Sequence, residues 1–404
     1  MDPVRDRLRA WQPEFAAIRQ DIHAHPELGN EEVRTAAIVA EKLRSYGNID
    51  VTEGVGGTGV VGVLRGRQEG HGTNRRQSIG LRADMDALAL TEQTGLPYAS
   101  KTSGRMHACG HDGHTTMLLA AARYLSENPD FAGTVNFIFQ PAEEGRGGAR
   151  RMLTDGLFER FPCDAVYGVH NGPGMEAGSF AIRKGPMMAG GGRWQVSFHG
   201  TGGHGGFTPH EATDVSVVLG HFLLGVQTVV SRNVAPGDTA VISVGYVQGG
   251  DREAANVMPS KVTVGGTMRF FEDHVREIID ARVKRLAETL AASSGCTAEV
   301  TMHWGMNPLS NHADEVHTAC AAARRVFDPA EVDGDTPPIT GGEDFGEMLR
   351  VKPGAFAFIG NGVNPDGVFQ PVHTPRYDFN DAIIPDGAAY WVSLVQEELS
   401  PSSS

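Results

Sequence analysis

Apolar and polar positions alternate with two different periods along the first part of the chain, and together they predict strands separated by helices. Helical spacing fills residues 3–46, with an interruption at Pro26, and it recurs at 115–126. Apolar runs of strand length, several of them typical of strands buried on both faces, occur at 59–64, 78–82, 134–139 and 165–169. Strands that alternate with helices predict an α/β layer around a central, mostly parallel sheet, flanked by helices.

A second pattern begins near Arg193 and has the order strand, helix, strand, strand, helix, strand. Its elements are expected at 194–198, 213–230, 240–247, 262–270, 273–292 and 298–303. This is the order of a ferredoxin-like α+β unit, which is self-contained and lies inside the chain. We therefore expect a discontinuous first domain at 1–186 and 303–404, and an inserted domain at 187–302.

Composition restricts the classes of function. The 404 residues are 40% hydrophobic and 21% charged, as in ordinary soluble proteins. The net charge of −14 argues against nucleic acid or an anionic membrane as the main partner. The four cysteines are scattered and form no disulfide framework, and the sequence shows neither a signal segment nor an apolar run near the 20 or so residues of a membrane span. These features predict a cytoplasmic protein without membrane association.

Candidate chemistry is concentrated in the run 106–114, which holds one thiol, three imidazoles and one carboxylate. Thiolate and imidazole are preferred ligands of zinc and its neighbours in the transition series. Glu143 and Glu144 follow a predicted strand, His170 ends another, and His373 lies between two prolines. Because the carboxyl ends of strands in open α/β sheets collect ligands, we expect these segments to converge.

This set of side chains favours two metals that share ligands and a water. Metals about 3.5–4 Å apart clamp both the attacking and the leaving oxygen of a displacement. Adjacent carboxylates on a loop point in different directions, so one can bind metal while the other acts as a general base. His204 is a further candidate because the glycines on both sides of it leave room for a ligand. The expected metal ligands are Cys109, His111, Glu144, His170 and His373.

These motifs resemble the di-metal aminoacylase family, which includes hippurate hydrolases, N-acyl-amino-acid amidohydrolases and plant auxin-conjugate hydrolases. The resemblance runs nearly end to end and is specific for the subfamily with a cysteine ligand. More distant relatives carry a metal-binding histidine where this chain has Arg82, and Cys109 with His111 takes over here. The segments that carry the resemblance are 23–28, 106–114, 140–145, 203–205, 256–259, 266–269, 341–345 and 373–375.

The resemblance implies a role for each candidate residue. It assigns metal binding to the five expected ligands, the general base to Glu143, and polarisation of the scissile carbonyl to His204, in its own subunit or in a partner's active site. Asp84 and Asp112 would orient ligands. A guanidinium fork matches a carboxylate, so Arg269 is a possible partner for the substrate's carboxylate. Substrate contacts are expected at Asn256, Arg269, Gly341 and Gly342.

The implied activity is hydrolysis of the amide bond of an N-acetyl, N-benzoyl or aryl-acetyl amino acid. Two divalent metals, zinc or manganese with cobalt or nickel as alternatives, would activate a water while Glu143 takes its proton. The implied assembly is a homodimer or higher homo-oligomer, with the inserted domain as lid or dimerisation domain. Two alternatives stay open. One is a metal-dependent deaminase or other C–N hydrolase on the same scaffold. The other is a non-catalytic metal- or ligand-binding protein, against which the spare carboxylate argues.

Overall fold

The chain divides into two compact units. The computed structural model describes residues 3–68, 76–363 and 367–400. The first unit contains Met1–Met187, Ser310–Pro337 and Asp344–Ser404, and the second contains Met188–Leu309 and Pro338–Glu343. The second unit is longer than the expected 187–302 and takes in a later segment. The reason is local pairing, since Ala189 N–H donates to the carbonyl oxygens of Ile339 and Gly341 at 3.2 and 2.9 Å.

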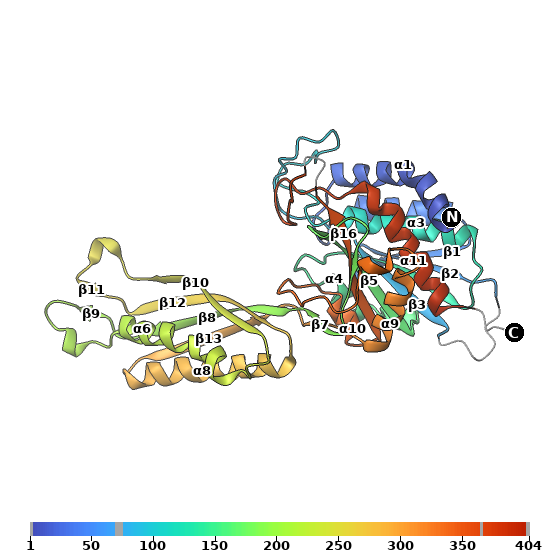
Figure 1. The fold of residues 1–404 in the computed structure, drawn as a ribbon. Helices are drawn as coiled ribbons and strands as arrows, with labels where there is room; N and C mark the ends of the chain where they lie inside the picture. Colours follow the sequence, from blue (N-terminus) through green and yellow to red (C-terminus); the bar gives the residue numbers. More distant parts are fainter. Residues whose placement is uncertain (1–2, 69–75, 364–366, 401–404) are drawn as a thin grey trace. The chain divides into compact units, whose positions relative to one another are not determined.

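An eight-stranded mixed sheet forms the centre of the first unit (Figure 1). Its strands are β1 (Ile49–Val55), β2 (Gly59–Arg65), β3 (Ser78–Asp84), β4 (Thr134–Gln140), β5 (Ala165–Pro173), β6 (Phe180–Ala181), β15 (Val332–Asp333) and β16 (Gly354–Gly362). The order is β1-β2-β4-β3-β5-β16-β6-β15. β4, β3, β5 and β16 run parallel in the middle, while β2 joins β4, and β6 joins β16, in antiparallel fashion. The expected parallel arrangement therefore holds for the four central strands. It does not extend to the outer strands, since β2 runs antiparallel to both β1 and β4, and β6 runs antiparallel to β16.

Helices cover the sheet of the first unit. They are α1 (Pro3–Ala24), α2 (Val33–Ser45), α3 (His111–Glu127), α4 (Gly148–Thr154), α5 (Leu157–Arg160), α9 (Ala313–Ala323), α10 (Gly346–Leu349) and α11 (Ile384–Glu398), with 3-10 turns at Pro329–Glu331 and Asp381–Ile383. α3 and α11 pack together against β3, with α1 against both. Successive side chains of a strand point to opposite faces. Ile79, Leu81 and Ala83 of β3 accordingly join the core formed with α3, and Arg82 between them points to the other face.

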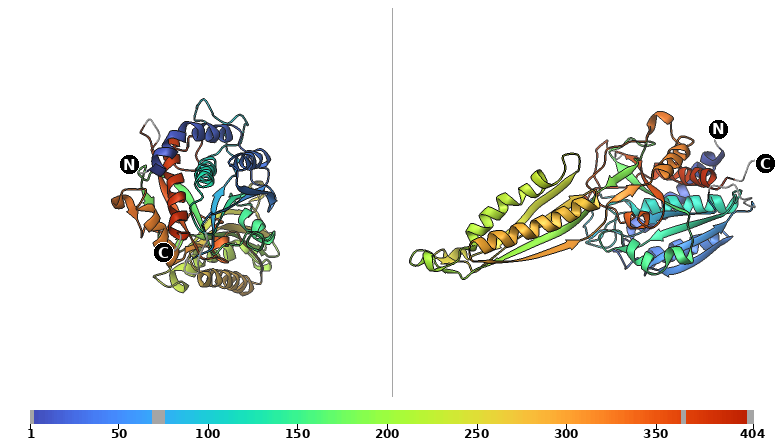
Figure 2. Two further views of the ribbon diagram at one scale, coloured as in Figure 1. Left: turned by 90° about the vertical axis from the view of Figure 1, so that its right-hand side faces the viewer. Right: turned by 90° about the horizontal axis from the view of Figure 1, so that it is seen from below.

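The second unit has a four-stranded antiparallel sheet in the order β10-β12-β8-β13. Its elements are β8 (Gly190–His199), β9 (Gly203–His204), α6 (Val215–Gly225), α7 (Gln227–Asn233), β10 (Ala240–Gly249), β11 (Val257–Met258), β12 (Lys261–Phe270), α8 (Asp273–Ser293) and β13 (Thr297–Trp304), with 3-10 turns at Pro209–Glu211 and Arg252–Ala254. Figure 2 shows its helices side by side over one face of this sheet, where their apolar sides build a second core. β7 (Gly185–Met188) and β14 (Leu309–Asn311) form a separate pair where the chain enters and leaves the unit.

One helix corrects an expectation about membranes. The helix Val215–Asn233, which comprises α6 and α7, is long and apolar enough to cross a membrane by length and composition alone. The expectation that no stretch reaches this length is therefore wrong. Helices from the cores of soluble proteins pass the same test. Here Val218, Phe222 and Val229 belong to the second core, which accounts for part of the helix's apolar character.

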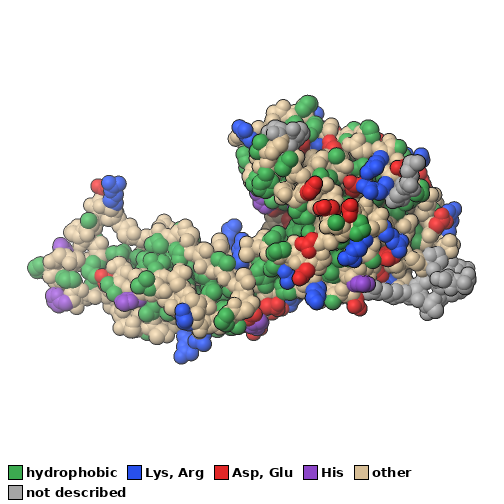
Figure 3. Space-filling model, in the orientation of Figure 1, with side chains coloured by type: hydrophobic (Ala, Val, Ile, Leu, Met, Phe, Trp, Pro, Cys, Tyr) green, Lys and Arg blue, Asp and Glu red, His purple; other side chains and the backbone are tan. Residues whose placement is uncertain are grey.

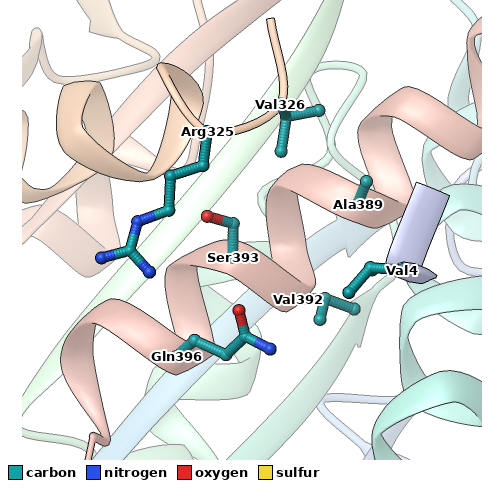
Figure 4. Close-up of a pocket in the computed structure, with 7 residues that line it drawn as sticks. All are labelled: Val4, Arg325, Val326, Ala389, Val392, Ser393 and Gln396. Atoms are coloured by element: carbon teal, nitrogen blue, oxygen red, sulfur yellow. The ribbon is translucent and has the colours of Figure 1, made fainter. Parts of the chain in front are cut away.

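A surface cavity of about 280 Å³ lies on the first unit, beside α1, α11 and the segment that follows α9 (Figure 4). It is lined by Val4, Arg325, Val326, Ala389, Val392, Ser393 and Gln396. None of these residues is among the predicted catalytic, metal-binding or substrate-binding residues. The cavity therefore lies apart from the candidate site residues.

Candidate functional site

The five expected ligands and Glu143 come together in the first unit. They form overlapping groups in which the ligand atoms lie within 4.8 Å of one another. The groups are Cys109 with His111 and His170, Cys109 with Glu144 and His373, and His111 with Glu143 and Glu144. The expected convergence is therefore present: Glu143 and Glu144 follow β4, His170 lies on β5, Cys109 and His111 lie at the start of α3, and His373 lies in the segment between β16 and the turn at Asp381–Ile383.

Gly110 sets the spacing between Cys109 and His111. Its φ of 91° lies in the left-handed region, which favours glycine. A Cβ at this position would lie 2.3 Å from Asn171 Oδ1 and 2.6 Å from the Tyr377 hydroxyl, so no larger residue fits. The turn leads directly into α3, so His111 is the first residue of the helix. The sequence predicts instead that the helix begins at 115, with His111 in the loop before it. Cys109 Sγ then lies 3.3 Å from His170 Nε2, on β5.

Asp86 orients two of the expected ligands, and sequence reasoning did not single it out. Its Oδ1 lies 3.2 Å from His111 Nδ1, and its Oδ2 accepts the N–H of Glu144 at 3.0 Å. Asp84 is placed nearby as expected, with Oδ1 2.7 Å from His114 Nδ1 and Oδ2 3.8 Å from His111 Nε2. The sequence could have indicated this role, because Asp86 is a second carboxylate two residues after Asp84, just beyond the end of the buried strand β3.

Asp112 was expected to orient a ligand, but it is held by α1 instead. Its Oδ2 lies 2.8 Å from His23 Nδ1 and 3.6 Å from Arg19 Nη1. Burial lowers the pKa of His23, but hydrogen bonds to Asp112 and Glu92 outweigh it and raise the pKa to about 9. Asp112 therefore belongs to a buried ion-pair network, because its side chain leaves the first turn of α3 toward α1.

The two adjacent glutamates have different partners. Ala142 before them has a positive φ of 56°, which turns the chain after β4. Glu144 Oε1 lies 3.1 Å from His373 Nε2. Glu143 is only 5% exposed, and its Oε1 accepts the N–H of Asp344 at 3.2 Å. Both carboxylates have an oxygen within 4.8 Å of a ring nitrogen of His111, and they differ in that Glu144 also faces His373 while Glu143 accepts from the backbone of Asp344.

The pKa values and the unpartnered buried atoms of this cluster show whether its residues favour a nearby positive charge, as metal ligands do. Contacts with Cys109 and Glu144 raise the pKa of His373 to about 10. Burial disfavours the charged form of His111, yet Asp84 and Cys109 outweigh it and hold its pKa well above the usual value. The buried atoms His111 Nε2 and Glu144 Oε1 have no hydrogen-bond partner of good geometry in the described part of the chain. Burial raises the pKa of the Cys109 thiol, and a bound divalent metal would hold it as the thiolate; this thiol with the neighbouring imidazoles and carboxylates is a donor set that fits such metals.

The remaining expected residues lie in the second unit. His204 is exposed, and its Nδ1 accepts the N–H groups of Gly206 and Phe207 at 3.2 and 3.1 Å. Because Nδ1 is an acceptor, the proton of the neutral ring is on Nε2, so His204 presents a hydrogen-bond donor. Asn256 is exposed, and its carbonyl accepts the N–H of Gly205 at 2.8 Å. Arg269, Gly341 and Gly342 also belong to this unit, and their contacts with substrate stay predictions.

Three comparisons relate these features to known proteins. Residues 80–397 match the sequence profile of peptidase family M20/M25/M40. The chain is 38% identical to a hippurate hydrolase from Campylobacter jejuni over 96% of this chain and 97% of that protein. It is also 38% identical to an N-acetyl-L-cysteine deacetylase from Bacillus subtilis, over 93% and 86%. A crystal structure from Bacillus subtilis, described as a dinuclear metal-binding peptidase from the M20 family, is similar with a TM-score of 0.81 and 30% identity, covering 96% and 98% of the two chains.

Proposed function

The chain belongs to peptidase family M20/M25/M40, and from this premise we propose that it is a metal-dependent amidohydrolase that cleaves the amide bond of N-acyl amino acids. The observation that carries the proposal is the cluster of thiol, imidazole and carboxylate groups around Glu143. The relatives named as hippurate hydrolase and N-acetyl-L-cysteine deacetylase support the substrate class, with acetyl, benzoyl and aryl-acetyl groups as the acyl groups to test.

The metal ligands in this proposal are Cys109, His111, Glu144, His170 and His373. The dinuclear relative supports two ions, and the donor types suit zinc or manganese, with cobalt or nickel as alternatives. When bound, such ions polarise a carbonyl and lower the pKa of a water toward neutrality. The remaining chemistry belongs to the side chains of the protein itself.

Glu143 serves as the general base. Its carboxylate takes a proton from the water that attacks the carbonyl carbon, and returns the proton to the amide nitrogen as the C–N bond breaks. The products are a carboxylic acid and a free amino acid. His204 donates its Nε2–H to the carbonyl oxygen as negative charge develops there. The expected substrate contacts are Asn256, Gly341, Gly342 and Arg269, the last of these to the substrate's carboxylate.

Replacement of the base tests this function. Glu143→Gln should lower kcat by about 10²–10⁴-fold on a panel of acetyl-, benzoyl- and indoleacetyl-amino acids. Metal content, measured by mass spectrometry of the purified protein, should not change. Glu41→Gln, an exposed position on α2, is the matched control. Normal turnover by Glu143→Gln would move the base elsewhere, and a metal-loaded wild type that hydrolyses no member of the panel would refute the substrate class.

We also infer that the second unit, with its ferredoxin-like arrangement, carries the lid and dimerisation role. β10 is an edge strand of its sheet, so its outer backbone groups are available to pair with another strand. Apolar side chains are exposed on β10 and α6, where Figure 3 shows hydrophobic side chains gathered. The most exposed are Val217 at 51%, Leu224 at 76%, Tyr246 at 43% and Val247 at 51%. A second copy of the chain would cover this apolar surface.

Light scattering after size-exclusion chromatography tests this pairing. The wild type should have at least twice the mass of the chain, and Leu224→Glu should shift it toward the monomer because a charge would enter an apolar contact. Val351→Glu, at a position 56% exposed on the first unit, is the matched control. A monomeric wild type would refute the pairing. A cytoplasmic location also stays a proposal, supported by the four free cysteines.

A further inference from the structure

We propose that Arg82 and Asp344 are positioning residues for Glu143. Together with Gln140 they form a buried clamp that fixes the peptide group to which the base is bound. Arg82 and Gln140 are fully buried, and Asp344 is 3% exposed. The inference rests on the proposed role of Glu143 as general base, and it adds the residues that would set the orientation of that base.

Asp344 is the centre of the clamp because three donors hold its side chain. Oδ1 accepts from Gln140 Nε2 at 2.6 Å and from Arg82 Nη2 at 3.3 Å. Oδ2 accepts the N–H of Ala149, at the start of α4, at 3.0 Å. These donors come from the ends of β3 and β4 and from α4, so the carboxylate is fixed to three separate parts of the first unit.

The backbone of Asp344 transmits this fixation to the base. Its N–H donates to Glu143 Oε1 at 3.2 Å. Gly341 and Gly342, which precede it closely in sequence, are exposed and have no side chains; the Gly341 carbonyl accepts the N–H of Ala189 at 2.9 Å, and the buried Glu343 comes directly before Asp344. The anchored side chain of Asp344 therefore holds its own N–H in place, and with it the oxygen of Glu143.

Arg82 fixes the orientation of the side chains in the clamp by donating to Gln140, Asp84 and Asp344. Its Nε donates to Gln140 Oε1 at 2.9 Å, which turns the amide so that Nε2 faces Asp344. Its Nη1 donates to Asp84 Oδ2 at 2.7 Å, and Asp84 in turn contacts His114. A planar guanidinium can bind two carboxylates in fixed directions, which an ammonium group cannot. One arginine thereby connects the carboxylate beside the metal ligands to the carboxylate beside the base.

The charges also require this arrangement. Carboxylate oxygens of Asp344 and Glu143 lie within 4.8 Å of one another in a buried environment. Two negative groups at this distance repel each other strongly unless a cation compensates them. Arg82 supplies one such charge, which it shares between Asp84 at 2.7 Å and Asp344 at 3.3 Å, without forming part of the expected ligand set. The clamp can therefore hold the base close to a second carboxylate.

The test uses Asp344→Asn in the metal-loaded full-length protein. Asparagine has nearly the same size, but its Nδ2 places a donor against the donors of Gln140 or Ala149. We expect kcat to fall by about 10–100-fold, since a misplacement of 1 Å can cost that much. KM should change by less than about twofold, because substrate binding does not use this residue. Metal content should stay that of the wild type.

Glu347→Gln is the matched control, because it makes the same acid-to-amide change on the same segment, where Glu347 pairs with the exposed Arg150. Hydrogen–deuterium exchange gives a readout that is independent of activity. Exchange in the peptides that contain Ala149 and Asp344 should become faster in Asp344→Asn and stay unchanged in Glu347→Gln. Arg82→Lys keeps the charge and loses the fork, so it should lower kcat in the same way and serves if Asp344→Asn does not fold.

The outcomes separate this inference from the proposed function. If exchange becomes faster while kcat stays that of the wild type, the clamp does not position the base and the inference is wrong. If kcat falls only together with metal content and melting temperature, the role of the clamp is structural and the inference is again wrong. If Glu143→Gln is inactive while Asp344→Asn is normal, the inference alone falls. Normal turnover by Glu143→Gln would remove the proposed function as well.

Discussion

Replacement of Asp86 by alanine should weaken metal binding while leaving the fold intact. Asp86 holds two expected ligands, with Oδ1 3.2 Å from His111 Nδ1 and Oδ2 accepting the N–H of Glu144 at 3.0 Å. Without the carboxylate, the imidazole of His111 can rotate and the loop that carries Glu144 loses an anchor. Both effects reduce the fraction of molecules in which the ligands point toward one another.

The magnitude follows from these two hydrogen bonds. Loss of a group that orients a metal ligand typically lowers metal affinity about 10–100-fold, or about 1.4–2.8 kcal/mol. A hydrogen bond to a charged group contributes about 1.5–3 kcal/mol. Because Asp86 serves two ligands rather than one, we expect the upper part of that range, close to 100-fold. Asp86→Asn keeps one acceptor and should lose less.

Competition with a chelator of known affinity measures this effect directly, on proteins loaded with zinc or manganese. Asp130→Ala is the matched control, since Asp130 pairs with Arg67 at the surface and the two side chains are 63% and 64% exposed. Melting temperatures of the metal-free proteins show whether the fold is intact. Equal dissociation constants for Asp86→Ala and the control, at unchanged melting temperature, would refute the reasoning that Asp86 orients the ligands.

Three other outcomes are expected. His204→Ala should keep its metals and lose about 10²–10³ in kcat, as for removal of an oxyanion donor, and a normal kcat would exclude His204 from the reaction. Gly110→Ala should lower the free energy of unfolding by about 2–5 kcal/mol, measured in urea, because a positive φ and a contact of 2.3 Å with Asn171 both oppose the methyl group. The pKa of His23, raised to about 9, makes its stabilisation complete below about pH 6.5 and lost as the pH rises through 9. Melting temperatures of the wild type should therefore fall more than those of His23→Gln between these values, and parallel curves would contradict this.

The position of the site could be predicted from the sequence because its polar residues follow directly after apolar runs. The apolar runs at 78–82, 134–139 and 165–169 correspond to β3, β4 and β5, so side chains near their ends were expected to converge. α11 was missed because nearly all of its faces are buried, and a helix that is apolar around most of its circumference lacks the one-sided period that identifies helices. The predicted start of α3, at 115, was four residues too far along the chain, because the first turn of the helix carries His111, Asp112 and His114 instead of apolar residues.

The amino-acid sequence by itself determined the family, the types of the expected ligands and the pair of glutamates, because these depend on residue type and on spacing along one segment. Only the tertiary structure decided that Asp86 faces His111 while Asp112 faces His23, and that Asp344 lies against Arg82 and Glu143. Residues of the same chemical type differ here only in the direction of their side chains and in the elements packed against them. Those directions arise from contacts between segments that are far apart in the chain, and local sequence does not encode them.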